Sequence, residues 1–248
     1  MLQGIIFDLG NTLIHFTGDW NAVLEESWQV LAEYLIVQGF DFEKDVFINT
    51  FRELFESRYY ERSVDHIEQP TIELLRQVML RLGYETLQKV ELEKAIEEFY
   101  RVSEAHWSTR AVVSSTLDDL KSEGLRMALI SNAGDASNVK RLLDKGQLKG
   151  YFDPILVSAD EGIRKPHVAL YKKVLQEWGL KAQEVVMIGD SLMEDILGAQ
   201  RSGVHHIWMK EHVDTAQNHD LSMQIRPEAV AKKFQEIPGI IHEMNEEA

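Results

Sequence analysis

The chain has 248 residues, 44% of them hydrophobic, which is enough for one large domain or two modest ones with a sizeable core. Its formal net charge of -15 repels nucleic acid and anionic lipid, so an anionic substrate must be attracted by a local positive site. It contains no cysteine, which excludes disulfides, thiolate catalysis and cysteine-ligated metal centres.

No apolar run reaches membrane-spanning length, and a predicted strand begins almost at the first residue, which leaves no room for a signal peptide. We therefore expect a cytoplasmic protein with no membrane or nucleic-acid partner. The first strand is the run Ile5-Ile6-Phe7, whose composition is typical of a strand buried on both faces. Asp8 follows at its carboxyl end, before the turn residues Gly10 and Asn11.

Residues 16–108 carry a helical pattern. Apolar side chains recur there at three- and four-residue spacing and predict four consecutive helices with no strand between them. In chain order these positions include Trp20, Val23, Leu24, Trp28, Leu31 and Leu35; Phe47, Phe51, Leu54 and Phe55; Ile72, Leu75, Met79 and Leu82; and Leu92, Ile96 and Phe99. Such stripes indicate core packing, so an all-α unit is expected over this range.

From residue 109 onward, strands and helices alternate. The predicted strands cover residues 125–130, 154–157, 184–188 and 204–209, and the predicted helices cover residues 115–124, 139–146, 166–178, 196–203 and 228–235. This alternation implies an α/β fold, with a parallel sheet, right-handed crossovers and flanking helices. The sheet would be built from residues 1–15 and 109–248, with the all-α unit inserted after its first strand.

Four strand ends carry polar groups. Asp8 ends the first strand and Ser131 the second, Lys165 lies in the loop after the third, and Asp190 ends the fourth. In a parallel sheet these ends share one edge, so the four groups are expected in one crevice. This set suits phosphoryl transfer through an aspartyl-phosphate.

In this hypothesis Asp8 is the nucleophile. Asp190 would bind Mg²⁺, a cation that takes few protein carboxylates and keeps several waters. Lys165 would neutralise the charges of Asp8 and of the phosphoryl oxygens. Taken alone, a single lysine is more often a solvated surface residue.

A phosphate-binding role follows for the turn after the second predicted strand. The Ser131 hydroxyl and the backbone N–H groups of Asn132 and Ala133 would bind the phosphate there, although a serine in this position also serves as a helix N-cap. Asp195 would begin a helix and hydrogen-bond either the metal-bound waters or Lys165. Its alternative role is to interact with the dipole of that helix.

Four short motifs occur in a fixed order along the chain. They are Phe7-Asp8-Leu9-Gly10-Asn11-Thr12, Ser131-Asn132, Arg164-Lys165-Pro166, and Gly189-Asp190-Ser191 with Asp195. Together they resemble the motifs of the haloacid dehalogenase-like hydrolase superfamily, and the resemblance covers the whole chain. The inserted helices are similar to the helical cap that some members carry after the first motif.

The resemblance implies a Rossmann-like core with a mobile lid and, for most members, a Mg²⁺-dependent phosphatase acting on a small phosphorylated substrate. Residue by residue, it makes Asp8 the nucleophile and Lys165 the charge stabiliser. It also implies two sets of binding residues. The phosphate would contact Asn11, Thr12, Ser131, Asn132 and Lys165, and the metal site would comprise Asp8, the backbone carbonyl of Gly10, Asp190 and Asp195.

Gly10 departs from the family pattern. Phosphatases of this superfamily usually carry a second aspartate there, which protonates the leaving group and later activates water. General acid–base groups contribute about 10²–10⁴-fold in rate. A phosphatase lacking this group would prefer good leaving groups, such as sugar 1-phosphates or acyl phosphates, or would use another side chain. The candidates for such a replacement are His15, Asp19, His66, Glu68 and His106.

Two further hypotheses remain open. A haloacid dehalogenase would also use Asp8 and needs no metal, but Gly189-Asp190 keeps a metal-binding carboxylate that similar dehalogenases replace. A non-catalytic phosphate-binding protein would retain the fold without turnover, and Gly10 is the residue that supports this reading.

Overall fold

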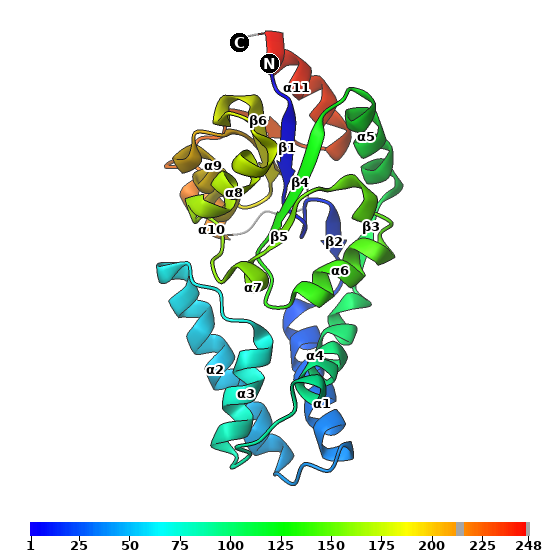
Figure 1. Ribbon diagram of the computed structural model, residues 1–248, viewed down its shortest axis with the longest axis vertical. Helices are drawn as coiled ribbons and strands as arrows, with labels where there is room; N and C mark the ends of the chain where they lie inside the picture. Colours follow the sequence, from blue (N-terminus) through cyan, green and yellow to red (C-terminus); the bar gives the residue numbers. More distant parts are fainter. Residues whose placement is uncertain (212–215, 247–248) are drawn as a thin grey trace.

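The computed structural model describes residues 1–211 and 216–246 (Figure 1). Its strands are β1 Gly4–Phe7, β2 Ile14–Phe16, β3 Trp107–Thr109, β4 Arg126–Ser131, β5 Ile155–Val157, β6 Val185–Gly189, β7 His205–Met209 and β8 Ala229–Ala231. Its α-helices are α1 Trp20–Val37, α2 Lys44–Asp65, α3 Thr71–Arg81, α4 Lys89–Glu104, α5 Ala111–Ser122, α6 Ala136–Lys145, α7 Ser158–Glu161, α8 Val168–Trp178, α9 Leu197–Ser202, α10 Ala216–Leu221 and α11 Ile237–Glu246. Shorter helical turns are η1 Lys149–Tyr151, η2 Ala182–Glu184, the π-helical η3 Leu192–Ile196 and η4 Phe234–Glu236.

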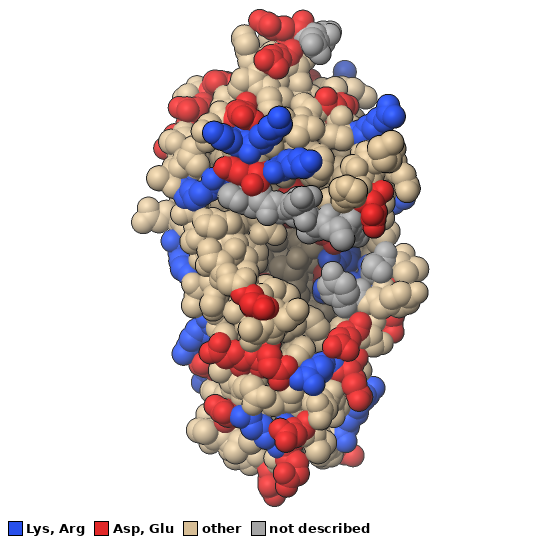
Figure 2. Space-filling model, turned by 180° about the vertical axis from the view of Figure 1, so that it is seen from behind, with Lys and Arg blue, Asp and Glu red and all other residues tan. Residues whose placement is uncertain are grey.

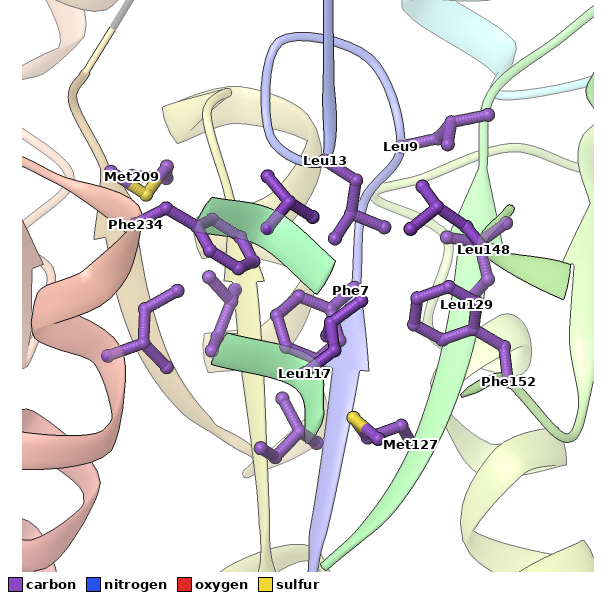
Figure 3. Close-up of a cluster of buried hydrophobic side chains, with 14 of the residues drawn as sticks. Phe7, Leu9, Leu13, Leu117, Met127, Leu129, Leu148, Phe152, Met209 and Phe234 are labelled. Carbon is purple, nitrogen blue, oxygen red and sulfur yellow. The ribbon is translucent and has the colours of Figure 1, made fainter. Parts of the chain in front are cut away.

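Within the described residues, six strands form a parallel sheet in the order β5-β4-β1-β6-β7-β8, which confirms the predicted α/β class. β1 lies between β4 and β6, with Phe7 opposite both Leu129 and Ile188. Successive side chains of β1 point to opposite faces of the sheet. Phe7 packs with residues of α5 and α11 on one face (Figure 3). Ile6 packs with residues of α8 and α9 on the other face.

The helices α1 to α4 form a helical bundle with a hydrophobic cluster of its own, as the aromatic and aliphatic stripes predicted. Phe47, Phe51 and Phe99 lie at its centre, buried to within 4% exposure. α1 begins where Asp19 accepts hydrogen bonds from the backbone of Asn21 and Ala22, as an N-cap does. The bundle lies beyond the carboxyl ends of the sheet strands (Figure 1).

The chain enters and leaves the bundle through a second, two-stranded sheet. β2 and β3 pair antiparallel, with His15 opposite Ser108. The two connections are therefore hydrogen-bonded to each other. None of the described helices is both long and apolar enough to cross a membrane.

Two parts of the sequence expectation were wrong. Residues 228–235 do not form a helix: Ala229–Ala231 is β8, the edge strand beside β7, and the last helix is α11 Ile237–Glu246. The segment is rich in helix-forming residues, but pairing with β7 overrides that local preference. The short strands β2 and β3 were also missed, because three residues are too few to show an alternating pattern.

Candidate active site

The polar groups at three neighbouring strand ends meet at one cavity. Asp8 follows β1, Ser131 ends β4 and Asp190 follows β6, and all three line a cavity of about 400 Å³ between the sheet and the helical bundle. Figure 2 shows a hollow between these two parts of the molecule, with uncharged residues along one side of it. Asp8 is 8% exposed and its backbone N–H donates to the Ile188 carbonyl, which continues the ladder of β1 one residue beyond the strand.

Lys165 lies buried behind Asp8, at 1% exposure, and is not the surface lysine that its local sequence allowed. Its Nζ donates to Asp8 Oδ1 at 2.6 Å and forms an ion pair with Asp195 Oδ1 at 2.6 Å. The Asn132 side chain holds the lysine backbone from both sides, because its Oδ1 accepts from Lys165 N and its Nδ2 donates to Lys165 O. Burial lowers the pKa of Lys165, but the carboxylates of Asp195 and Asp8 outweigh that effect and the net pKa is raised.

Asp8, Asp190 and Asp195 form an acidic cluster whose ligand oxygens lie within 4.8 Å of one another. Burial raises the pKa of Asp8 and raises that of Asp190 well above its usual value, and it raises the pKa of Asp195 to about 7. One ammonium group thus faces three carboxylates, and the excess negative charge fits a divalent cation. Carboxylate oxygens are the ligands that Mg²⁺ prefers.

Asp195 differs from the other two carboxylates because both of its oxygens have protein partners. Oδ1 pairs with Lys165, and Oδ2 accepts from the backbone N–H of Ser191 at 2.9 Å. The residue lies in the π-helical turn η3, a rare geometry that is frequent at functional sites. This arrangement favours the interpretation in which Asp195 supports the lysine over direct ligation of a metal.

The turn after β4 differs in detail from the expected phosphate-binding turn. Ser131, Asn132 and Ala133 line the cavity, but the Ala133 N–H donates to Ser158 Oγ at 2.9 Å and the Asn132 side chain is bonded to Lys165. The Ser131 hydroxyl and the Asn132 N–H are therefore better placed than the Ala133 N–H to bind a phosphate.

The first motif contributes Asn11 and Thr12 in different ways. Asn11 lines the cavity with a φ of 57°, in the left-handed region that a sharp turn after β1 requires. Thr12 is 4% exposed and does not line the cavity, and its hydroxyl has no hydrogen-bond partner among the described residues. A buried hydroxyl of this kind leaves an acceptor or donor unmatched within the turn.

Asn218 contributes to the site without any sequence signal that would have identified it. Its Nδ2 donates to the Asp190 carbonyl at 2.9 Å, and its Oδ1 accepts from Leu192 N at 2.9 Å. Trp208 Nε1 also donates to the Asp190 carbonyl, at 2.8 Å. These contacts hold the backbone on both sides of the Asp190 turn, so that its carboxyl group faces the cavity.

Gly10 also lines the cavity, and the indole ring of Trp107 lies next to it. A methyl group at Gly10 would lie 3.5 Å from Cη2 of Trp107, so the ring borders the place of the usual second aspartate. Among the described residues, none of the five candidate replacements lines the cavity: these are His15, Asp19, His66, Glu68 and His106. His106 Nδ1 is paired with the Thr17 carbonyl, and Asp19 caps α1.

Glu68 instead joins the helical bundle to the sheet. Its Oε2 accepts from Arg164 Nη1 at 3.1 Å and from Ser158 Oγ at 2.9 Å, and it is 4% exposed. Arg164 Nη2 also donates to Glu194 Oε1 at 3.0 Å. Beside this network, Ile67 and Ile163 form an antiparallel bridge. The loop between α2 and α3 is thereby bonded to the residues that adjoin Lys165 and Asp195.

We expect Glu68→Gln to lower the free energy of unfolding by about 1–3 kcal/mol, because the buried Arg164 guanidinium loses a charged acceptor. Thermal denaturation would show this as a fall in Tm of about 2–4 °C per kcal/mol. The control is Glu73→Gln, which removes an exposed pair with Arg76 and should change stability by less than about 0.5 kcal/mol. Equal stability of the two variants would contradict a structural role for the Glu68 network.

Comparison with known proteins places this geometry in a family. Residues 42–209 match the haloacid dehalogenase-like hydrolase family, and the chain belongs to that family, as the motifs predicted. It is similar to a glyceraldehyde 3-phosphate phosphatase of Pyrococcus furiosus, with 27% identity over 209 residues, 84% of this chain and 81% of the relative. It is also similar to a phosphoglycolate phosphatase of Pectobacterium atrosepticum, with 26% identity over 243 residues, 97% of this chain and 92% of the relative.

Solved structures share the fold over almost the whole chain. A 2-haloacid dehalogenase of Pseudomonas syringae pv. Tomato superposes with a TM-score of 0.67 at 21% identity, covering 98% of this chain and 99% of that one. A HAD phosphatase of Thermococcus onnurineus gives a TM-score of 0.62 at 18% identity, covering 97% and 98%. At these identities the likeness concerns the architecture alone.

Proposed function

We propose that this protein is a Mg²⁺-dependent phosphatase that hydrolyses a small phosphorylated metabolite through an aspartyl-phosphate on Asp8. The observation that carries the proposal is the buried Lys165 ammonium, held 2.6 Å from both Asp8 and Asp195 at the carboxyl end of β1. The similarity to relatives named as phosphatases supports it.

The chain's own residues then have distinct tasks. Asp8 supplies the attacking carboxylate oxygen, and Lys165 stabilises the negative charge that develops on the phosphoryl oxygens. Ser131 and the Asn132 N–H orient the phosphate. Asp8, Asp190 and the Gly10 carbonyl would hold the Mg²⁺ ion, which when bound neutralises charge on the phosphoryl group.

The helical bundle, residues 16–108, is proposed to act as a cap over this site. The cavity lies between the bundle and the strand ends, so a substrate in it is shielded by both. Cap residues would contact the organic part of the substrate, and displacement of the cap would admit it.

One observation favours a second candidate, a phosphate-binding protein without turnover: Gly10 lacks the usual carboxyl group, and Trp107 borders its place. The retention of Asp8, Lys165 and Asp190 in one constellation argues for the enzyme. A dehalogenase has no comparable support, because Asp190 remains in the acidic cluster and the likeness to dehalogenase structures is one of fold.

A phosphate-release screen over many small phosphate esters, with and without Mg²⁺, tests the proposal. We expect Mg²⁺-dependent release that Asp8→Asn abolishes. Tight binding of phosphate analogues without release from any ester would establish the non-catalytic alternative. Halide release from a 2-haloacid in excess chelator would establish the dehalogenase.

Metal binding can be measured apart from activity. We expect saturating Mg²⁺ to raise the Tm of the wild type, because a ligand at 100 times its Kd stabilises the folded state by about 2.7 kcal/mol. In Asp190→Asn the rise should be much smaller, since one of the clustered carboxylates is lost. An equal rise in both proteins would place the cation elsewhere.

A further inference from the structure

Outside the polar strand ends, much of the cavity lining is apolar. The apolar side chains of this wall come from α1, α2, α4, β3 and α6, and they include Trp20, Leu24, Phe55, Phe99, Trp107 and Leu142. These side chains and Asp8 line the same cavity. The organic part of a bound phosphate ester would therefore lie against aromatic and aliphatic surface.

The polar groups in this wall are already bonded within the protein. Ser27 Oγ donates to the Val23 carbonyl at 2.8 Å, and Ser103 Oγ donates to the Tyr100 carbonyl at 3.0 Å. The hydroxyls of Thr71 and Tyr100 bond each other at 2.7 Å. A substrate with many hydroxyl groups would have to bury them against few available donors, and unmatched buried hydroxyls weaken binding.

Two further polar residues of the lining, Asn138 and Arg62, also have partners within the protein. Asn138 lines the cavity, but its Nδ2 donates to Glu104 Oε1 at 2.8 Å. Arg62 also lines it, and its guanidinium lies 3.7 Å from the buried carboxylate of Glu68. The wall therefore suits an uncharged, flat group better than a polyol or a second strong anion.

Among the residues that the structure describes, the cavity offers the leaving group no suitable proton donor. Among the described lining residues, the carboxyl groups are those of Asp8, Asp190 and Glu194; Asp8 is the proposed nucleophile, Asp190 is a proposed metal ligand, and Glu194 is bonded to Arg164. Burial raises the pKa of the Tyr100 hydroxyl, which makes it a poor acid near neutral pH. With glycine at position 10, the leaving oxygen has to depart as an anion. An oxyanion leaves more readily the more acidic its conjugate hydroxyl group is, so simple alkoxides leave slowly.

We propose that the site is selective for aryl phosphate monoesters, whose leaving group is both flat and apolar and a stable anion. This inference rests on the proposed phosphatase function and adds its substrate class. Phenols have a pKa of about 10, far below that of simple alcohols. An aryl ring in the cavity would pack against the aromatic wall, with its phosphate at Asp8.

The reaction balances without an added proton donor. A carboxylate oxygen of Asp8 forms a bond to phosphorus while the bond from phosphorus to the aryl oxygen breaks, and the bonding electrons leave on the phenolate. Water then attacks the aspartyl-phosphate, which restores the Asp8 carboxylate and releases inorganic phosphate and a proton. The phenolate takes up that proton in solution, so one ester and one water give one phenol and one phosphate.

The test measures kcat/KM of the Mg²⁺-loaded full chain for substituted phenyl phosphates, benzyl phosphate, glycerol 3-phosphate and acetyl phosphate. Benzyl phosphate matches phenyl phosphate in ring and charge, but its alcohol is a much weaker acid. We expect phenyl phosphate to exceed benzyl phosphate by about 10²-fold or more, the size of a missing general acid. Gly10→Asp should raise kcat/KM for benzyl phosphate and so reduce the ratio of the phenyl phosphate value to the benzyl phosphate value.

Binding of non-hydrolysable phosphonates tests whether the apolar wall favours an aromatic ring. Phenylphosphonate should bind the wild type at least about tenfold more tightly than 2-hydroxyethylphosphonate in calorimetry, since an apolar ring is buried. Leu24→Asn, which places a polar group in the apolar wall, should reduce that preference.

The outcomes separate this inference from the proposed function. If acetyl phosphate is hydrolysed in an Asp8-dependent way but phenyl phosphate does not exceed benzyl phosphate, or the two phosphonates bind equally, the aryl selectivity is wrong and the phosphatase stands. If no ester releases phosphate, the phosphatase itself is wrong, and the aryl selectivity falls with it.

Discussion

Replacing Asp8 by asparagine is expected to lower Mg²⁺-dependent phosphate release by about 10⁴-fold or more, as the loss of other catalytic nucleophiles does. Asparagine keeps the shape of the side chain and an oxygen that can accept the hydrogen bond from Lys165, which lies 2.6 Å from Oδ1. The loss should therefore appear in kcat, measured by steady-state phosphate release, with the fold intact.

Circular dichroism and thermal denaturation separate this loss from unfolding. The Tm of Asp8→Asn should equal or exceed that of the wild type without Mg²⁺, because one of the mutually repelling buried carboxylates has gone. The control is Asp160→Asn, on the exposed side of α7 and outside the cavity, which should retain full activity. Residual turnover within tenfold of the wild type would overturn the role of Asp8.

Lys165→Met is expected to have the largest effect on stability. Methionine matches the length of the aliphatic part of the lysine side chain but leaves Asp8 and Asp195 buried without their ammonium partner. Removing one partner of a buried ion pair costs about 3–5 kcal/mol. Phosphate release should also fall by about 10²–10³-fold, because the developing charge loses a preorganised cation.

The pH dependence of this variant follows from the carboxylates. Burial raises the pKa of Asp195 to about 7 and that of Asp8 in the same direction, and both should rise further once the lysine is removed. As the pH falls, a carboxyl group whose pKa is higher in the folded than in the unfolded protein binds its proton in the folded protein at the higher pH. The free energy of unfolding of the variant therefore increases as the pH falls. In urea denaturation, the free energy of unfolding that Lys165→Met loses relative to the wild type should be smaller at pH 6 than at pH 8.

The control for this variant is Lys173→Met. Lys173 pairs with Glu161 at the surface and is 51% exposed, so its loss should change stability by less than about 0.5 kcal/mol. A Lys165→Met protein as stable as this control at pH 8 would show that the buried cluster does not depend on the ammonium group.

The sheet and its polar strand ends could be predicted because each signal is local. Apolar runs that stop at Asp8, Ser131 and Asp190 identify buried strands and their carboxyl ends, and the parallel sheet brings those ends together. The long helices of the bundle were equally readable from their apolar spacing. The catalytic roles assigned to these residues remain predictions that the experiments above address.

The contacts that support the site could not be read in the same way. Glu68 and Arg164 are 96 residues apart in the chain, and Asn218 reaches Asp190 from 28 residues away. Neither pair leaves a periodic or spaced pattern, because each arises only when separate elements pack together. The proposed replacements for the missing aspartate lie outside the cavity for a similar reason: His106 Nδ1 pairs with the Thr17 carbonyl, which is 89 residues away in the chain, and Asp19 caps α1.

The bridge between Ile67 and Ile163 ties a loop of the helical bundle to the strip of chain that leads directly into Lys165. We therefore expect the position of the lysine and the attachment of the bundle to be energetically coupled, and such coupling is reciprocal. If an anion bound at Lys165 favours one position of the lysine, the equilibrium for attachment of the bundle to the core should shift by the same factor as the affinity for the anion. In the other direction, a covalent link between residues 67 and 163 should increase the affinity of the site for phosphate.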